Sequence, residues 1–516
     1  MNNQLSNLML EIRRMQMIKP GETFEGLNVT ICTTFDCNLR CTYCYELNKR
    51  AICIDEKTIY KFIDILLNDP NIIGLDGTKD AWIQHSGLVL DFIGGDSFMQ
   101  PDLIDKTLEY FIYKATIMKH PFATNWRASI STNGTLFGDP KVQKLIEKYI
   151  ENFSIGVSID GCPEIHDANR IFTVRQKNGK PLGTMSTIMK WWPWLSEISP
   201  ESTNTTKSTC SKNSIPWLYK SLKFMHDPYP NGLGISYVNQ NFIMEPTGCE
   251  EDDYVLLDEQ FRKCHKYLYN HRRELYWSMF DVYGANKRSD SIIDFNHNIT
   301  KSWCGSGAMP TVGLNGKIYP CFRWLPHTMD KLDDSNEMCV GDVESGIINK
   351  NAFKRVKDST REKISSKYCL ECEYEAGCAY CIGGCYAENR AFKRTEHICY
   401  ITKLRLKWTR RYWDLLEEFE HLGYDYFNLS KSTGYVVDDT LLMNNKHRYW
   451  GDDGKLKPEF RTPDNPTGEP LLTIKDLPEE YKDAWKYRPT TVVKEGEEIN
   501  GDDNLPINNV GQTSVH

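Results

Sequence analysis

Three cysteines near the start of the sequence constrain the fold and the chemistry of this chain more than any other feature. Cys37, Cys41 and Cys44 form a C-x3-C-x2-C run directly after a β-rich segment at residues 27–31. Three thiolates so close together can converge on one face of a loop and hold an iron–sulfur cluster. A [4Fe–4S] cluster normally takes four cysteines, so three would leave one iron open to a substrate or cofactor. A zinc site completed elsewhere in the chain, or coincidental spacing, is the alternative.

Composition decides how the cysteines should be interpreted. The 516 residues include 18 cysteines, and the formal net charge is -8, without the basic excess expected of a nucleic-acid-binding protein. The first 20 residues lack the features of a signal peptide, and no stretch has the roughly 18 apolar residues of a membrane-spanning helix. We therefore expect a cytoplasmic protein with no nucleic-acid or membrane partner, whose clustered cysteines bind metal rather than form disulfides.

Strand-like and helix-like segments alternate through the first half of the chain. Apolar residues with helical spacing predict helices over 55–67, 101–118 and 142–149. Strand candidates lie between them and beyond, at 88–93, 128–131, 153–159, 206–210 and 234–238. This alternation predicts an α/β fold of βαβ units with a parallel sheet, flat or closed into a barrel.

Polar and glycine-rich motifs follow several of these predicted strands. They are Gly94-Gly95-Asp96-Ser97, then Ser131-Thr132-Asn133-Gly134-Thr135, then Ser158-Ile159-Asp160-Gly161, with His166, Asp167 and Arg170 downstream. Singly, a glycine pair indicates a turn, and Ser158 or Asp160 could cap a helix. Together they occupy the ends of strands, where parallel α/β folds place their active sites.

With these motifs in this order behind C-x3-C-x2-C, the sequence resembles the radical S-adenosylmethionine superfamily. The resemblance implies a partial (β/α)6 TIM-like barrel in which Cys37, Cys41 and Cys44 bind a catalytic [4Fe–4S] cluster. S-adenosyl-L-methionine would chelate the fourth iron through its amino and carboxylate groups. Asp96 stands where the family usually has glutamate. The implied cofactor-binding residues are Tyr43, Gly94, Gly95, Asp96, Asn133, Ser158, Asp160 and Arg170.

A second cysteine-rich stretch runs from residue 304 to residue 399. Its eight cysteines are Cys304, Cys321, Cys369, Cys372, Cys378, Cys381, Cys385 and Cys399. Glycine is abundant and hydrophobic periodicity is weak, so we expect this region to be ordered by metals rather than by a large core. Its closely spaced cysteine pairs, Cys369 with Cys372 and Cys381 with Cys385, suit tetrahedral thiolate sites. Such sites would be either iron–sulfur clusters or a double zinc ribbon.

This stretch is similar to a SPASM domain, which carries two auxiliary [4Fe–4S] clusters in peptide- and protein-modifying members of the superfamily. The resemblance implies that Cys304, Cys321 and Cys385 serve the first auxiliary cluster. It gives the second cluster Cys369, Cys372, Cys399 and one of Cys378 or Cys381. The remaining cysteine would complete the first cluster or leave it an open iron for a substrate thiolate. The spacing of the cysteines alone does not decide between these two possibilities.

We expect five regions along the chain. They are an N-terminal extension (1–24), a radical S-adenosylmethionine core (25–245), a helical linker (246–300), a SPASM domain (301–425) and an acidic, partly disordered tail (426–516). A basic helix follows Cys399. Its charged residues either form an ordinary solvent-exposed surface or belong to the features in which this sequence resembles peptide maturases. Its cations are Lys403, Arg405, Lys407, Arg410 and Arg411.

The resemblance implies an oxidoreductase that uses a 5′-deoxyadenosyl radical to abstract hydrogen from a ribosomally synthesised precursor peptide. The product would be a thioether or carbon–carbon crosslink, and an electron donor such as flavodoxin or ferredoxin would be a second partner. An anaerobic sulfatase-maturating enzyme, which makes formylglycine, is the alternative of the same chemistry. A non-catalytic zinc-binding scaffold is the alternative of another class.

Overall fold

The structure is a computed structural model of the whole chain. It describes residues 26–46, 49–68, 87–174, 183–272, 274–280, 309–328, 337–372, 374, 378, 380–420, 458 and 491–496, and the structural statements below concern these residues. Cys304, the extension 1–24 and most of the tail 426–516 lie outside them.

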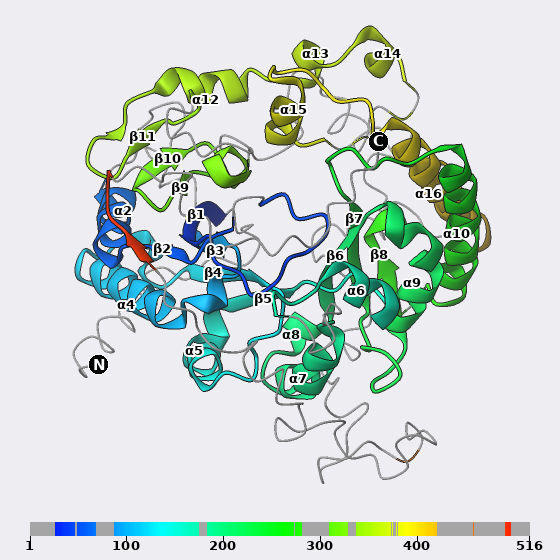
Figure 1. Cartoon of the computed structure of the whole chain (residues 1–516), viewed down its shortest axis with the longest axis horizontal. Coiled ribbons are helices and arrows are strands. Elements are labelled where there is room, and N and C mark those ends of the chain that lie inside the picture. Colours follow the sequence, from blue (N-terminus) through cyan, green and yellow to red (C-terminus); the bar gives the residue numbers. More distant parts are fainter. Residues whose placement is uncertain are drawn as a thin grey trace.

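Parallel strands form the centre of the molecule. One sheet has the adjacent strands β1 (Gly26–Thr34), β3 (Gly87–Gly94), β4 (Trp126–Thr132) and β5 (Phe153–Val157), and a second has β6 (Thr205–Cys210), β7 (Tyr237–Phe242) and β8 (Tyr276–Trp277). A parallel bridge between Ser158 and Lys207 joins β5 to β6. The strands follow an open arc with helices on its outer side (Figure 1). The predicted α/β fold with a partial barrel is confirmed.

Amphipathic helices cover the outside of this arc. In α2, the residues Ile59, Phe62, Ile63 and Leu66 recur at helical spacing and are all buried. Asp55 caps this helix as expected, because its carboxylate accepts a hydrogen bond from the amide of Lys57 at 3.1 Å. The helices of this part are α2 (Glu56–Asn68), α4 (Pro101–Ile117), α5 (Pro140–Tyr149), α6 (Pro163–Asn169), α7 (Met185–Ile198), α8 (Pro200–Thr203), α9 (Leu218–His226) and α10 (Glu251–Asn270).

The strand predicted at 234–238 begins three residues later, as β7. The backbone amides of Leu233 and Ile235 donate to carbonyls at the end of α9, at 3.1 and 2.8 Å. Both side chains are buried. Residues 233–235 therefore pack against the end of α9 before the strand starts. A run of β-favouring residues does not show whether they form a strand or cover the end of a helix.

The cysteine-rich region closes over the open side of the arc and shares its core (Figure 1). Strand β9 pairs in parallel with β1, and antiparallel strands continue the sheet from it. Val312, Ile318 and Tyr319 are completely buried. The expectation that metals rather than a core order this region is wrong for residues 309–328 and 337–347. Strands of two or three residues are too short to show periodicity in the sequence. The elements are β9 (Thr311–Val312), β10 (Lys317–Tyr319), β11 (Gly341–Asp342), β12 (Gly346–Ile347), α12 (Lys350–Lys357), α13 (Arg361–Ile364), α14 (Lys367–Leu370), α15 (Ile382–Asn389) and α16 (Cys399–Glu420).

A short strand from the C-terminal region, β13 (Thr491–Val493), pairs in parallel with β2 (Ile52–Ile54). The amide of Asp55 donates to the carbonyl of Val493 at 3.2 Å, and the side chain of Val493 is buried. Lys61 pairs with Glu495 at 2.6 Å. This part of the predicted tail therefore forms an edge of the main sheet. It lies next to β2, the strand that follows the first cysteine cluster in the sequence.

No helix among the residues described here has both the length and the apolar character needed to cross a membrane.

We expect Val493→Asp to destabilise the protein, because it places a charge where an apolar side chain is 7% exposed. A loss of about 1–3 kcal/mol of unfolding free energy is typical for such a change. The measurement is the thermal midpoint, with hydrogen exchange at residues 52–55. Val492→Asp is the matched control, because Val492 is 47% exposed. Equal shifts in the two variants would contradict the docking of β13.

Candidate active site and cysteine clusters

The loop that carries the first three cysteines leaves the end of β1 and is held by a neighbouring segment. Residues 38–42 run antiparallel to residues 169–173, with a bridge between Leu39 and Phe172. Three backbone hydrogen bonds of 2.9–3.0 Å join the two segments. The loop thus has a defined path at the C-terminal edge of the parallel strands.

The three thiols lie within electrostatic reach of one another and of the Lys49 ammonium. Cys37 is buried, whereas Cys41 and Cys44 are half-buried. Burial raises the pKa of Cys37 and of Cys41, the latter to about 12. Burial lowers the pKa of Lys49, but the three thiolates raise it more, so it lies well above its usual value. A bound metal would favour the thiolate form of these cysteines.

Gly94 and Gly95 allow the end of β3 to touch the chain leading into this loop. A Cβ atom would lie 2.0 Å from the carbonyl oxygen of Thr34 at Gly94, where φ is +138°, and 2.1 Å from that of Asp36 at Gly95. The amide of Gly95 donates to Thr34 at 3.0 Å. No side chain fits at either position, so this glycine pair is required by close approach and not only by a turn.

Asp96 ties the ends of β3 and β4 together. Its buried carboxylate accepts hydrogen bonds from the amide of Asn133 (2.7 Å), the hydroxyl of Thr132 (3.0 Å) and the amide of Phe98 (3.1 Å). Burial raises the pKa of Asp96 to about 6, although these donors oppose the change. The carboxylate is one methylene shorter than the glutamate usual in the resembled family, and these bonds hold it within the scaffold.

Asn133 connects the end of β4 to the cysteine loop. Its side-chain amide donates to Asn38 at 2.9 Å and to the sulfur of Cys37 at 3.8 Å. Its oxygen accepts from the amide of Thr135 at 2.9 Å. The position of the buried cysteine is therefore set by a network that begins on a neighbouring strand.

Asp160 joins the loop to the end of β5. The hydroxyl of Tyr43 donates to its carboxylate at 2.5 Å, and Nε of Arg170 donates to it at 2.9 Å. The guanidinium lies 5.6 Å from the centre of the Tyr43 ring. The Asp160 side chain is fully buried and that of Arg170 is 9% exposed. Ser158 follows on the same edge, where its amide donates to Thr132 at 2.8 Å.

The structure thus places all eight predicted cofactor-binding residues at one edge of the strands, around the cysteine loop. Ser158 and Asp160 follow β5, and neither caps a helix: α6 is preceded by Cys162, whose side chain makes no capping bond. Five of the six polar side chains among them bond to one another or to neighbouring amides and hydroxyls, namely those of Tyr43, Asp96, Asn133, Asp160 and Arg170.

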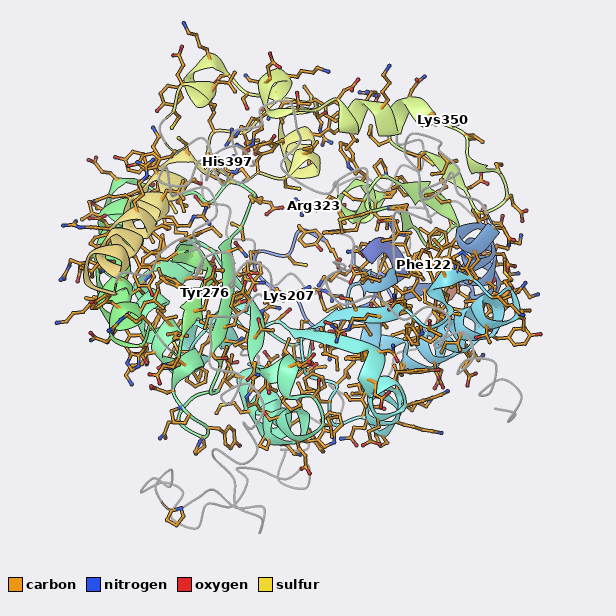
Figure 2. All side chains as sticks on the ribbon, turned by 180° about the vertical axis from the view of Figure 1, so that it is seen from behind. Phe122, Lys207, Tyr276, Arg323, Lys350 and His397 are labelled. Atoms are coloured by element: carbon orange, nitrogen blue, oxygen red, sulfur yellow. The ribbon has the colours of Figure 1, made fainter. Side chains whose placement is uncertain are left out.

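Beside this edge lies a cavity of about 600 Å³ between the cysteine loop and the cysteine-rich region. That size is in the range of small-molecule sites. It is lined by Thr42, Tyr43, Cys44, Tyr45, Ser211, Lys212, Asn213, Ile243, Met244, Glu245, Pro246, Thr247, Arg323, Thr328, Gly384, Ala387, Glu388 and Arg390. Figure 2 labels Arg323, which lines this cavity from the cysteine-rich region, and Lys207, which lies on β6.

Arg323 and Glu245 were not predicted from the sequence. The guanidinium of Arg323 donates to Glu245 at 2.6 Å and lies 4.5 Å from the centre of the Tyr45 ring. Only 12% of the Arg323 side chain is exposed. Its position two residues after Cys321 is the only sequence signal that could have drawn attention to it, since its partners are distant in the chain.

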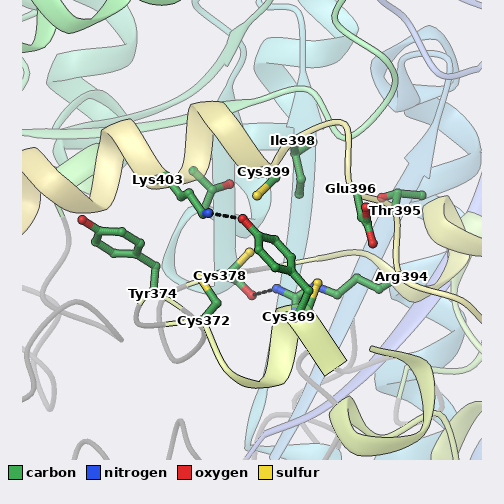
Figure 3. A pocket seen from close by; sticks show the side chains of 12 residues that line it. Cys369, Cys372, Tyr374, Cys378, Arg394, Thr395, Glu396, Ile398, Cys399 and Lys403 are labelled. Atoms are coloured by element: carbon green, nitrogen blue, oxygen red, sulfur yellow. Dashed lines mark hydrogen bonds between the residues drawn. The ribbon is translucent and has the colours of Figure 1, made fainter. Parts of the chain in front are cut away.

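Four cysteines of the second region line a separate cavity of about 140 Å³ (Figure 3). They are Cys369, Cys372, Cys378 and Cys399. Arg394 is buried beside them and donates to the carbonyl of Cys378 at 3.0 Å.

The structure separates Cys378 from Cys381, which the spacing could not do. The sulfur of Cys381 accepts a hydrogen bond from the amide of Gly384 at 3.4 Å, at the start of α15. Its charge acts on Arg323 and on Cys385, and it does not line the four-cysteine cavity. Cys381 therefore belongs with Cys385, on the side of the region that faces Arg323.

No family model matches the chain. It is 30% identical over 189 residues to the uncharacterized protein MJ0907 of Methanocaldococcus jannaschii, covering 37% of this chain and 54% of that protein. It is 29% identical over 154 residues to a serine-type anaerobic sulfatase-maturating enzyme of Bacteroides thetaiotaomicron, covering 28% of this chain and 31% of that enzyme. The chain therefore spans about half of the first relative and less than a third of the second.

The structure of anSMEcpe with bound AdoMet and the Cp18Cys peptide superposes with a TM-score of 0.54 at 16% identity. The match covers 76% of this chain and 99% of that one. The chain shares the fold of anSMEcpe. This confirms the fold that the sequence resemblance implied.

We expect Gly95→Ala to displace the cysteine loop, because the added methyl group would lie 2.1 Å from a backbone oxygen. A loss of about 2 kcal/mol or more of stability and reduced iron incorporation should follow. Gly313→Ala is the matched control, since its nearest contact is a side-chain methyl at 3.2 Å. Thermal midpoints and iron content check the prediction, and equal effects in both variants would refute it.

His166 should make the fold sensitive to acid. Burial lowers its pKa to about 3, against about 6.5 in an unfolded chain. The unfolded chain binds more protons between these values, so stability falls as the pH drops below about 6.5. From pH 7 to pH 5.5 this contributes a loss of about 1 kcal/mol, which His166→Gln should remove. Denaturant unfolding at both pH values measures it, and an unchanged pH dependence in the variant would show the assignment to be wrong.

Proposed function

We propose that the chain is a radical S-adenosylmethionine enzyme that modifies a ribosomally synthesised precursor peptide, forming a thioether or carbon–carbon crosslink. The observation that carries the proposal is the convergence of three thiols and eight predicted cofactor-binding residues at one strand edge, beside a cavity of about 600 Å³. The fold shared with an AdoMet-bound structure supports it.

Cys37, Cys41 and Cys44 would hold a [4Fe–4S] cluster whose open iron binds S-adenosyl-L-methionine. When bound and reduced, this group would supply the electron for cleavage of S-adenosyl-L-methionine and so the radical that the reaction needs. The protein's own task is positioning and exclusion of side reactions. Tyr43 lies on the cysteine loop itself, and its hydroxyl is held by Asp160.

The polar network sets the positions of these groups before a cofactor binds. Arg170 and Asp160 are a buried pair, 2.9 Å apart, so the carboxylate that orients Tyr43 is itself oriented. Gly94 and Gly95 bring a strand end against the loop without side chains between them. Preorganisation of this kind reduces the cost of placing a reactive cofactor beside a substrate.

The second cysteine region would hold two auxiliary [4Fe–4S] clusters. We assign Cys369, Cys372, Cys378 and Cys399 to one, because they line a common cavity. We assign Cys304, Cys321, Cys381 and Cys385 to the other. The eleven cysteines then divide into three, four and four, and the extra cysteine of the spacing pattern completes a four-cysteine set. These clusters would take up the electron left when the substrate is oxidised.

The substrate peptide would occupy the cavity between the cysteine loop and the cysteine-rich region. The anSMEcpe structure contains a peptide as well as AdoMet, which supports a peptide partner. The Arg323–Glu245 pair forms part of the wall and offers charges of both signs. We further propose a cytoplasmic location, an electron donor of the flavodoxin or ferredoxin class, and the boundaries 25–245 and 301–425 for the core and the SPASM domain.

Formylglycine formation on a sulfatase is the second candidate, because a serine-type anaerobic sulfatase-maturating enzyme is among the relatives. It needs the same radical and differs in the residue oxidised. Incubation of the reduced enzyme with S-adenosyl-L-methionine and each substrate type, followed by mass spectrometry, separates the two. A crosslink and the oxidation of serine to formylglycine both remove two hydrogens, whereas oxidation of cysteine to formylglycine also replaces sulfur by oxygen. The deciding measurement is therefore reaction of the product with a hydrazine, because formylglycine carries an aldehyde and a crosslink does not.

We expect Cys41→Ala to abolish 5′-deoxyadenosine formation and Cys372→Ala to spare it while impairing product formation. The reason is that Cys41 lies in the loop beside the cofactor-binding residues, whereas Cys372 lines the separate cavity. Each variant should lose about four of about twelve irons per chain. Anaerobic assay with dithionite and iron and sulfide analysis measure both. Zinc without sulfide in the wild-type protein would instead support the scaffold alternative.

A further inference from the structure

Two histidines and a glutamate meet at a place that contains no cysteine. They are His226, His271 and Glu274, and each offers one ligand atom within 4.8 Å of the others. The centres of the two imidazole rings lie 4.9 Å apart, and Nδ1 of His271 is hydrogen-bonded to the Glu274 carboxylate. Two imidazoles and one carboxylate are a ligand set that holds zinc in proteins.

These three residues lie where two outer helices end. His226 is the last residue of α9, and His271 immediately follows α10. The two helices pack against each other on the outside of the arc (Figure 1). Each helix leads into a strand of the same parallel sheet, α9 into β7 and α10 into β8. The cluster therefore lies at the edge where these strands begin, opposite to the edge that carries the cysteine loop.

The backbone fixes the positions from which the three side chains extend. The carbonyl of His271 accepts hydrogen bonds from the amides of Glu274 (3.0 Å) and Leu275 (2.9 Å), so a tight turn brings the carboxylate back to the ring. The amide that follows His226 closes the last turn of α9 with a hydrogen bond of 2.7 Å. Ligands that are already in place lose little conformational freedom when a metal binds.

The surrounding charges favour a cation at this place. The C-terminal ends of α9 and α10 both carry partial negative charge. Two neighbouring basic side chains are engaged with other groups. Lys223 pairs with Asp227 at 2.6 Å. Arg272 donates to the carbonyl of Tyr269 at 3.0 Å and lies 4.6 Å from the centre of its ring.

Tyr267 supplies the outer contact that a metal-binding histidine usually has. Its hydroxyl lies 2.8 Å from Nδ1 of His226, and the centre of its ring lies 4.4 Å from that of His271. A hydrogen bond to one ring nitrogen fixes the orientation of an imidazole and leaves the other nitrogen for a metal. The simpler alternative, a hydrogen-bonded pair of His271 and Glu274 without a metal, needs neither the second imidazole nor this tyrosine.

We propose that His226, His271 and Glu274 form a zinc site. Zinc accepts two nitrogens and one oxygen in tetrahedral geometry, with water as the fourth ligand. Neighbouring ligand atoms in such a site are about 3.4 Å apart, so the side chains need to move little from their present spacing. The ion takes the place of the proton that His271 and Glu274 share, and this proton passes to solvent.

The position of the site gives the ion a structural role. It pins together the segments that lead into β7 and β8, at the edge of an α/β barrel that serves stability rather than chemistry. This role is independent of the proposed function. It adds about one zinc to the about twelve irons per chain, with sulfide present. The scaffold alternative instead requires zinc on cysteine, without sulfide.

The test is zinc X-ray absorption spectroscopy of the iron-loaded full chain, equilibrated with one equivalent of zinc chloride and then dialysed. We expect a first shell of nitrogen and oxygen at about 2.0–2.1 Å without sulfur. Sulfur at about 2.3 Å would place the zinc on cysteine and overturn the proposal, as would the loss of all zinc on dialysis. The spectrum is taken on the unaltered protein, so the result does not depend on how a variant folds.

Variants then identify the ligands. His226→Gln and Glu274→Gln should each weaken zinc binding more than about tenfold, measured by competition with a chelating dye, because loss of an outer partner alone costs that much. His397→Gln is the matched control, since His397 also pairs with a glutamate, Glu388, at 3.0 Å. Zinc should raise the thermal midpoint of the wild type and the control but not of the two site variants. Equal zinc affinity in all four proteins would overturn the proposal.

Discussion

The close approach of β3 to the chain before the cysteine loop is the constraint on which the site depends. At Gly94 and Gly95 two backbones meet at distances that exclude any side chain. This contact sets where Asp96 lies, and Asp96 in turn holds Asn133. Asn133 then reaches the sulfur of Cys37. The cysteine loop is thus positioned by a chain of contacts that starts from the absence of two Cβ atoms.

The local sequence pattern was sufficient to predict the partial barrel and the residues that lie at the ends of its strands. Gly94, Asn133 and Asp160 follow segments with clear β-character, and parallel strands bring their ends together whatever the details of packing. The same reasoning could not distinguish Cys378 from Cys381, because spacing does not reveal that α15 starts at residue 382 and draws Cys381 into its first turn. The sequence pattern also predicted the start of β7 three residues too early. The reason is similar, because apolar residues that pack against the end of a helix look like apolar residues of a strand.

Contacts between distant segments were outside the reach of sequence reasoning. Arg323 meets Glu245 across 78 positions. The cysteine-rich region was expected to depend on metals, yet Val312 and Ile318 are in the same core as the barrel. The sheet continues from β1 into β9, so the spatial relation between the cysteine loop and the cysteine-rich region is a property of the fold, set by hydrogen bonds between these strands.

The pairing of β13 with β2 has a consequence for the order in which the protein is made. The two strands are separated by more than 400 positions, so β2 leaves the ribosome long before its partner exists. At roughly 5–20 residues per second, that edge of the nascent sheet stays open for about 20–90 seconds. An unpaired edge can accept a wrong strand. The cysteine loop begins at the end of β1, to which β2 is paired, so the side of the sheet next to this loop is closed only after β13 has been made.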